Sequence, residues 1–96
     1  MNELKEITNE IFDRNYFKVI KSRIDEGEPD EIIPRISVTS FSINGVIGEM
    51  VISSYIDYYP LRTYISIPGT NPNFQYSNTK EEVIEFIDKV FIDYLI

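Results

Sequence analysis

The chain has 96 residues and a mass of 11.3 kDa, and its 16 acidic and 9 basic side chains give a net charge of −7. It contains no Cys and no His, which excludes a disulfide scaffold, a Cys/His zinc site and any catalytic relay built on His or Cys. With 43% hydrophobic and 14% aromatic residues, the sequence predicts one acidic globular domain over residues 1–96 rather than a disordered chain.

The first segment is predicted to be a helix over residues 2–14. Leu4, Ile7 and Ile11 recur at spacings of three and four, which places them on one face. Asn15 is a helix stop, because Asn tolerates the left-handed conformation that ends many helices. Residues 16–24 are rich in aromatic and β-branched side chains and favour a strand, although continuation of the first helix is the alternative.

A loop is predicted over residues 25–31, since Gly27 and Pro29 interrupt any regular structure there. Its acidic residues are Asp25, Glu26, Glu28, Asp30 and Glu31. The position of the glycine does not fit an EF-hand, so the segment is interpreted as a solvated charge run rather than a calcium loop.

Two β-rich runs, 32–43 and 46–56, flank the dipeptide Asn44-Gly45. Asn-Gly favours a two-residue hairpin turn, because both positions tolerate positive φ. This turn sets Ile43 opposite Val46 and Phe41 opposite Gly48, and the face that carries Phe41 is the predicted core face.

After a turn at 57–60, residues 61–67 alternate as a half-buried strand, and 68–78 are predicted to be a loop that Phe74 and Tyr76 anchor to the body. Thr79 and Glu82 form a capping box that begins a last helix with a broad apolar face. The members of that face are Val83, Ile84, Ile87, Val90, Phe91, Tyr94 and Leu95, which belong either to the core or to a dimer contact. Lys89 is placed where it can pair with Glu85. The prediction is an α+β fold, a four-stranded antiparallel meander with N- and C-terminal helices packed on one face, in the order α-β-β-β-β-α.

The charge is unevenly distributed along the chain. Residues 1–31 carry a net −4, residues 32–79 are neutral and residues 80–96 carry −3. One acidic row on the first helix consists of Glu3, Glu6, Glu10 and Asp13. Because the helix dipole disfavours anions near a C-terminus, local stability does not explain Glu10 and Asp13, and binding of a basic partner is one interpretation. An ordinary solvated face is the other. Tyr58 and Tyr59, adjacent in a turn, are further candidate contacts.

An acidic surface repels phosphate, so we expect no direct nucleic-acid binding. No apolar run is long enough to span a membrane, and Met1 is followed by charged rather than apolar residues, so we expect a cytoplasmic protein without a signal peptide. No phosphate loop, nucleophile motif or metal motif is present, so we expect neither an enzyme nor a bound cofactor or metal.

The layout resembles some small phage-encoded anti-CRISPR inhibitors of CRISPR nucleases. The resemblance is carried by residues 4–16 leading into 17–21, by the Asn44-Gly45 hairpin and by the acidic helix over 81–91. It implies acidic side chains that imitate DNA phosphates in a basic channel, here Glu3, Glu6, Glu10, Asp13 and the 25–31 loop. The Tyr-rich region 55–64 departs from the pattern.

The resulting hypothesis is a non-catalytic acidic protein-binding module. It would inhibit a basic, nucleic-acid-binding protein by occupying the surface that protein uses for DNA. A homodimeric chaperone, adaptor or immunity-type protein is the alternative.

Overall fold

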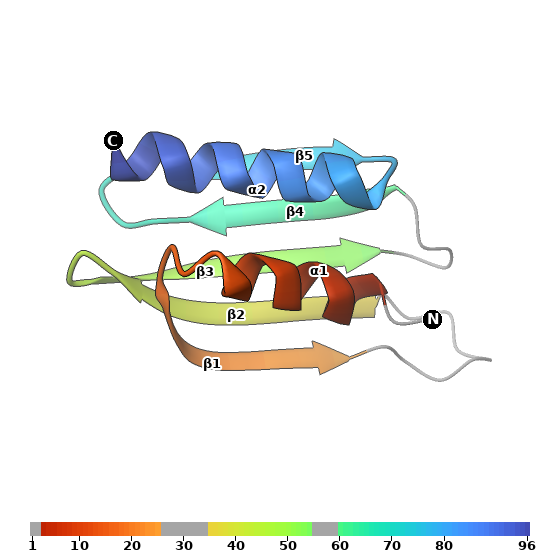
Figure 1. Ribbon diagram of the computed structural model, residues 1–96, viewed down its shortest axis with the longest axis horizontal. Coiled ribbons are helices and arrows are strands. Elements are labelled where there is room, and N and C mark those ends of the chain that lie inside the picture. The colour runs from red at the N-terminus through yellow and green to blue at the C-terminus, as the bar shows by residue number, and fades with distance from the viewer. Residues whose placement is uncertain (1–2, 26–34, 55–59) are drawn as a thin grey trace.

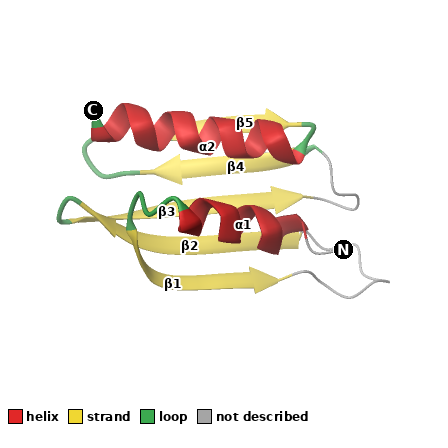
Figure 2. Ribbon diagram, viewed as in Figure 1, coloured by secondary structure: helices red, strands yellow, loops and turns green. Residues whose placement is uncertain are grey.

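The computed structural model describes residues 3–25, 35–54 and 60–96, which form two layers (Figure 1). One layer is an antiparallel sheet in the order β1-β2-β3-β4-β5. Its strands are β1 (Lys18–Asp25), β2 (Arg35–Ile43), β3 (Val46–Ser54), β4 (Leu61–Ser66) and β5 (Asn73–Ser77). The other layer consists of α1 (Glu3–Asp13) and α2 (Lys80–Leu95), which pack together on one face of the sheet (Figure 2). The predicted α+β class and the placement of both helices on one face are confirmed.

The prediction of four strands is wrong, because β5 lies within the segment 68–78 that was expected to be a loop. β5 pairs with β4 in an unbroken antiparallel register. The residues that β5 turns toward the helices are polar: Asn73, Gln75 and Ser77. Its aromatic residues, Phe74 and Tyr76, lie on the opposite face and are 53% and 59% exposed, so they do not anchor the segment as predicted. This inverted pattern concealed the strand, since a half-buried strand ordinarily places its apolar residues inward.

The connection from α1 to β1 follows the sequence prediction closely. Asn15 adopts φ 57° just after α1 and turns the chain, as the left-handed tolerance of Asn allows. Residues 18–25 then form a strand, which confirms the strand assignment over a continued helix. Asp25 is the last residue of β1, so its expected place in the acidic loop is wrong.

The β2–β3 hairpin is confirmed in turn and register. Asn44 and Gly45 have φ values of 48° and 81°, so both central residues of the turn are left-handed. Ile43 pairs with Val46 and Phe41 with Gly48. The face that carries Phe41 lies in the core, as predicted.

The core between the layers is built from aliphatic side chains and a cluster of aromatic rings. Phe41 is fully buried, and its ring centroid lies 4.6 Å from that of Phe17 and 5.3 Å from that of Phe91. The ring lies directly above Gly48, where an added Cβ would be 2.6 Å from Phe41 Cζ. The absence of a side chain at residue 48 therefore makes room for Phe41 in the core.

The N-terminus of α2 is capped largely as predicted. The Thr79 hydroxyl accepts a hydrogen bond from the Glu82 amide at 3.1 Å. The Glu82 carboxylate accepts from the Asn78 amide at 3.3 Å, one residue earlier than in a standard capping box. Farther along α2, Lys89 pairs with Asp93 at 3.3 Å rather than with Glu85, and Leu95 of the predicted apolar face is 46% exposed. Among the described residues, no helix combines the length and apolar character that crossing a membrane would require.

Candidate functional site

Most acidic side chains of the described residues lie on the two helices. α1 and α2 together carry nine carboxylates and three lysines. Six of these acidic residues are exposed: Glu6, Asp13, Glu81, Glu82, Glu85 and Asp93. We call this surface the acidic helix layer.

The predicted acidic row on α1 is partly neutralised by a cation from α2. Lys80 Nζ lies 3.2 Å from Glu10 Oε1 and 3.7 Å from Glu6 Oε2. The hydrogen bond to Glu10 raises the pKa of Lys80 above its usual 10.5, so the ammonium stays charged at neutral pH. Glu6 and Glu10 are therefore partly exposed and also join α1 to α2 through Lys80. Sequence reasoning could not place this contact, because it joins residues 70 positions or more apart.

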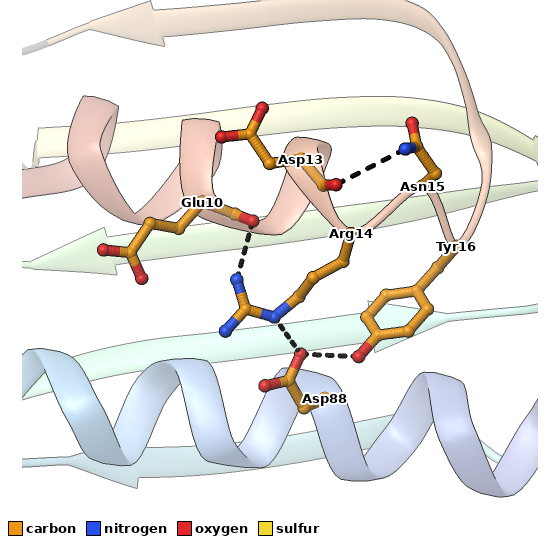
Figure 3. A network of polar contacts seen from close by, with 6 residues as sticks. All are labelled: Glu10, Asp13, Arg14, Asn15, Tyr16 and Asp88. Carbon is orange, nitrogen blue, oxygen red and sulfur yellow. Dashed lines mark hydrogen bonds and ion pairs between the residues drawn. The ribbon is translucent and has the colours of Figure 1, made fainter.

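A second contact joins α2 to the segment just after α1 and centres on Asp88 (Figure 3). Its Oδ1 lies 2.7 Å from Arg14 Nε and accepts a hydrogen bond of 2.7 Å from the Tyr16 hydroxyl. Arg14 also donates from Nη1 to the Glu10 carbonyl at 2.8 Å, which satisfies one of the open carbonyls at the end of α1. Burial and the hydrogen bond to Asp88 raise the pKa of Tyr16 above 10.0. Asp88 thus has a structural role in holding α2 to the segment that follows α1.

A groove of about 330 Å³ lies between α1 and α2. It is lined by four carboxylates, one lysine and one apolar residue: Glu10, Glu81, Glu85, Asp88, Lys80 and Ile84. Lys80 occupies the α1 side through its contact with Glu10. Glu81 and Glu85 are exposed, so this groove offers carboxylates to an incoming cationic side chain.

The other predicted contact residues divide into two groups. Glu3 and Asp13 lie at the two ends of α1, and Asp25 ends β1, with Ile36 as its cross-strand partner. The remaining predictions, Glu26, Glu28, Asp30, Glu31, Tyr58 and Tyr59, lie outside the described residues. The described part of the chain contains no group of three or more carboxylates placed to hold a metal ion.

The sheet has the opposite charge balance from the helices. The five strands carry five cations and only two carboxylates, Asp25 and Glu49. Three of the cations lie on the edge strand β1, namely Lys18, Lys21 and Arg23. The net charge counted over residues 1–31 conceals this separation, because that range combines basic β1 with acidic α1 and the acidic loop. The described fold therefore has one acidic layer and one basic layer.

No family model, curated protein or solved structure matches this chain. The features that can indicate a function are therefore the acidic helix layer and the edge strands of the sheet, β1 and β5.

Proposed function

We propose that the protein is a non-catalytic, acidic protein-binding module whose helix layer docks on a basic surface of another protein. The observation that supports it is the concentration of nine carboxylates on two adjacent helices, six of them exposed. Opposite charges on two surfaces accelerate encounter and fix orientation. In its specific form, the proposal is a phage-type inhibitor that imitates DNA charge against a basic nucleic-acid-binding protein.

The charge spacing on α1 supports imitation of a nucleic-acid backbone. Glu3, Glu6, Glu10 and Asp13 extend over ten residue steps, or about 15 Å at 1.5 Å per residue, which gives a charge about every 5 Å. A DNA strand carries one phosphate per about 3.4 Å along the helix axis. Of the exposed carboxylates of α2, Glu81 and Glu85 line the groove beside α1 and add to this charge, whereas Glu82 and Asp93 line grooves beside β5. Lys80 offsets part of the charge of Glu6 and Glu10, so the spacing of the carboxylates, rather than their net charge density, is what approaches that of a phosphate row.

The groove between α1 and α2 offers a specific contact for a partner's arginine or lysine. Glu81 and Glu85 are exposed at its rim, and Arg in particular binds carboxylates through two parallel hydrogen bonds. Ile84 contributes an apolar wall against which the aliphatic part of such a side chain can pack.

The test begins with affinity purification of partners from the native host and continues with binding measurements on single charge reversals. Glu85→Lys lies in the acidic helix layer, and Glu49→Lys makes the same change at an exposed glutamate of the sheet. We expect Glu85→Lys to weaken the complex about tenfold, equivalent to about 1.4 kcal/mol, and Glu49→Lys to leave it unchanged. Equal affinity for wild type and Glu85→Lys, with both proteins folded by circular dichroism, would contradict the proposal.

A further inference from the structure

The two edges of the sheet differ in how they resist pairing with another strand. The β1 edge carries Lys18, Lys21 and Arg23 and has a register shift between Val19 and Lys21. Charged side chains and bulges are the features by which proteins protect an edge strand. β5, at the other edge, carries no charged residue and no proline, and its register with β4 is regular. β5 is therefore the edge on which an additional strand can pair.

Apolar surface is exposed on both sides of β5. On the face away from the helices, Phe74 and Tyr76 are more than half exposed, and their rings contact each other edge-to-face with centroids 5.0 Å apart. On the helix side, a groove of about 420 Å³ separates β5 from α2. Phe86 and Val90 contribute apolar lining, and Gln75, Lys89 and Asp93 contribute polar lining. A strand added to β5 would cover surface on both sides of the sheet.

We propose that β5 pairs antiparallel with β5 of a second copy of this chain, across a two-fold axis through Gln75, to make one continuous sheet. The five residues of β5 are self-complementary about that centre. Phe74 lies opposite the partner's Tyr76, and Tyr76 lies opposite the partner's Phe74. Asn73 and Ser77 form polar pairs in the same way. Cross-strand aromatic pairs stabilise antiparallel sheets, so this register joins the two exposed ring pairs into one cluster.

The position of α2 fits the same arrangement. α2 packs on both β4 and β5 (Figure 1). Neighbouring strands lie about 4.8 Å apart, so a helix centred between β4 and β5 would lie about 10 Å from its two-fold copy. Packed helices lie 8–10 Å apart. Phe86 and Val90 of each copy would then close the groove at the junction.

The groove between β5 and α2 shares no lining residue with the acidic groove, although Glu85 of the acidic groove also lines a third groove beside Gln75 and Tyr76. The salt response separates the two proposals as well. Pairing through β5 brings two acidic α2 helices together, so added salt should strengthen the dimer, whereas it should weaken a complex with a basic partner.

Light scattering on the full chain, from micromolar to submillimolar concentration, should give twice the 11.3 kDa monomer mass. Tyr76→Lys introduces the kind of charge found on β1 and should leave the protein folded and monomeric. Ile47→Lys is the matched control, since Ile47 is 65% exposed on β3, away from this edge, and this variant should remain dimeric. A wild type that is monomeric throughout, or a dimer that Tyr76→Lys leaves intact, would overturn the proposal.

Because the chain has no Cys, a single introduced thiol tests the register directly. In the proposed dimer, the two copies of Gln75 face each other with Cα atoms about 4.5–5.5 Å apart, within disulfide range. Gln75→Cys should therefore form a disulfide-linked dimer under mild oxidation. Phe74→Cys should not, because the two copies of residue 74 are about 8 Å apart, beyond the Cα separation that a disulfide spans. The reverse result would exclude this register.

Discussion

Gly48→Ala tests the account of the core most sharply, because the structure fixes what an added methyl group would meet. Its Cβ would lie 2.6 Å from Phe41 Cζ, 2.7 Å from Phe41 Cε1 and 2.7 Å from the Ser66 carbonyl oxygen. Phe41 is fully buried between Phe17 and Phe91, so its ring cannot move away freely. Overpacking of a core costs 1–3 kcal/mol. With a ring and a backbone atom both obstructing the methyl group, we expect a loss of about 3 kcal/mol in the free energy of unfolding.

The assay is urea unfolding followed by far-ultraviolet circular dichroism, with an unchanged slope as the sign that only stability has altered. Gly45→Ala is the control: its Cβ would meet nothing within 4 Å, so only the left-handed φ of 81° opposes it, at about 1 kcal/mol. In a Phe41→Leu background, Gly48→Ala should cost less, because Leu lacks the Cζ and Cε1 atoms. A cost below about 1 kcal/mol, or the same cost in both backgrounds, would show that the Phe41 ring does not obstruct the added methyl group.

Two further changes test a buried hydroxyl and an ionisable contact. The Thr63 hydroxyl is buried without a hydrogen-bond partner among the described residues, so Thr63→Val should stabilise the protein by about 1 kcal/mol. Thr39→Val should destabilise the protein, because the equally buried Thr39 hydroxyl is hydrogen-bonded to Ser22. Thermal unfolding of both variants measures the two effects, and a loss of stability in Thr63→Val would contradict the prediction. Folding raises the pKa of the Tyr16 hydroxyl above 10.0. The stability that this hydroxyl contributes is therefore complete below pH 10 and is lost as the pH rises through the pKa of the folded state. Tyr16→Phe should therefore have a flatter stability profile above pH 10 in alkaline urea titrations, and identical profiles would argue against the Asp88 contact.

The hairpin and the helix boundaries could be predicted because their determinants are local. Asn44 and Gly45 supply the two left-handed positions that the turn requires, and a two-residue turn then fixes every pair along β2 and β3. Asn15 and Thr79 likewise act within one turn of the helix that each bounds.

β5 could not be predicted by the same reasoning, because its pairing partner rather than its composition makes it a strand. Asn73 has low strand propensity, and the polar Asn73 and Gln75 face the helices while the aromatic residues face outward. The register with β4 supplies the backbone hydrogen bonds that override this local preference.

The candidate site was predictable in its residue types and not in its contacts. Periodicity placed Glu6 and Glu10 on one face of α1, but their pairing with Lys80 depends on how α2 packs against α1. Likewise, charge counting along the chain identified acidic ends without revealing that β1 is a basic edge strand. Both features follow from tertiary packing, which residue spacing alone does not encode.

The most direct test of the proposed function is a competition measurement on a purified partner. The protein is titrated into a complex of that partner with labelled duplex DNA, and the bound DNA is followed by fluorescence anisotropy at two salt concentrations. A helix layer that occupies the DNA-binding surface should displace the DNA completely, and its inhibition constant, corrected for the DNA affinity at each salt concentration, should rise with salt because salt screens the contacts between its carboxylates and the partner's cations. A ternary complex in which DNA stays bound at saturating protein would contradict the claim.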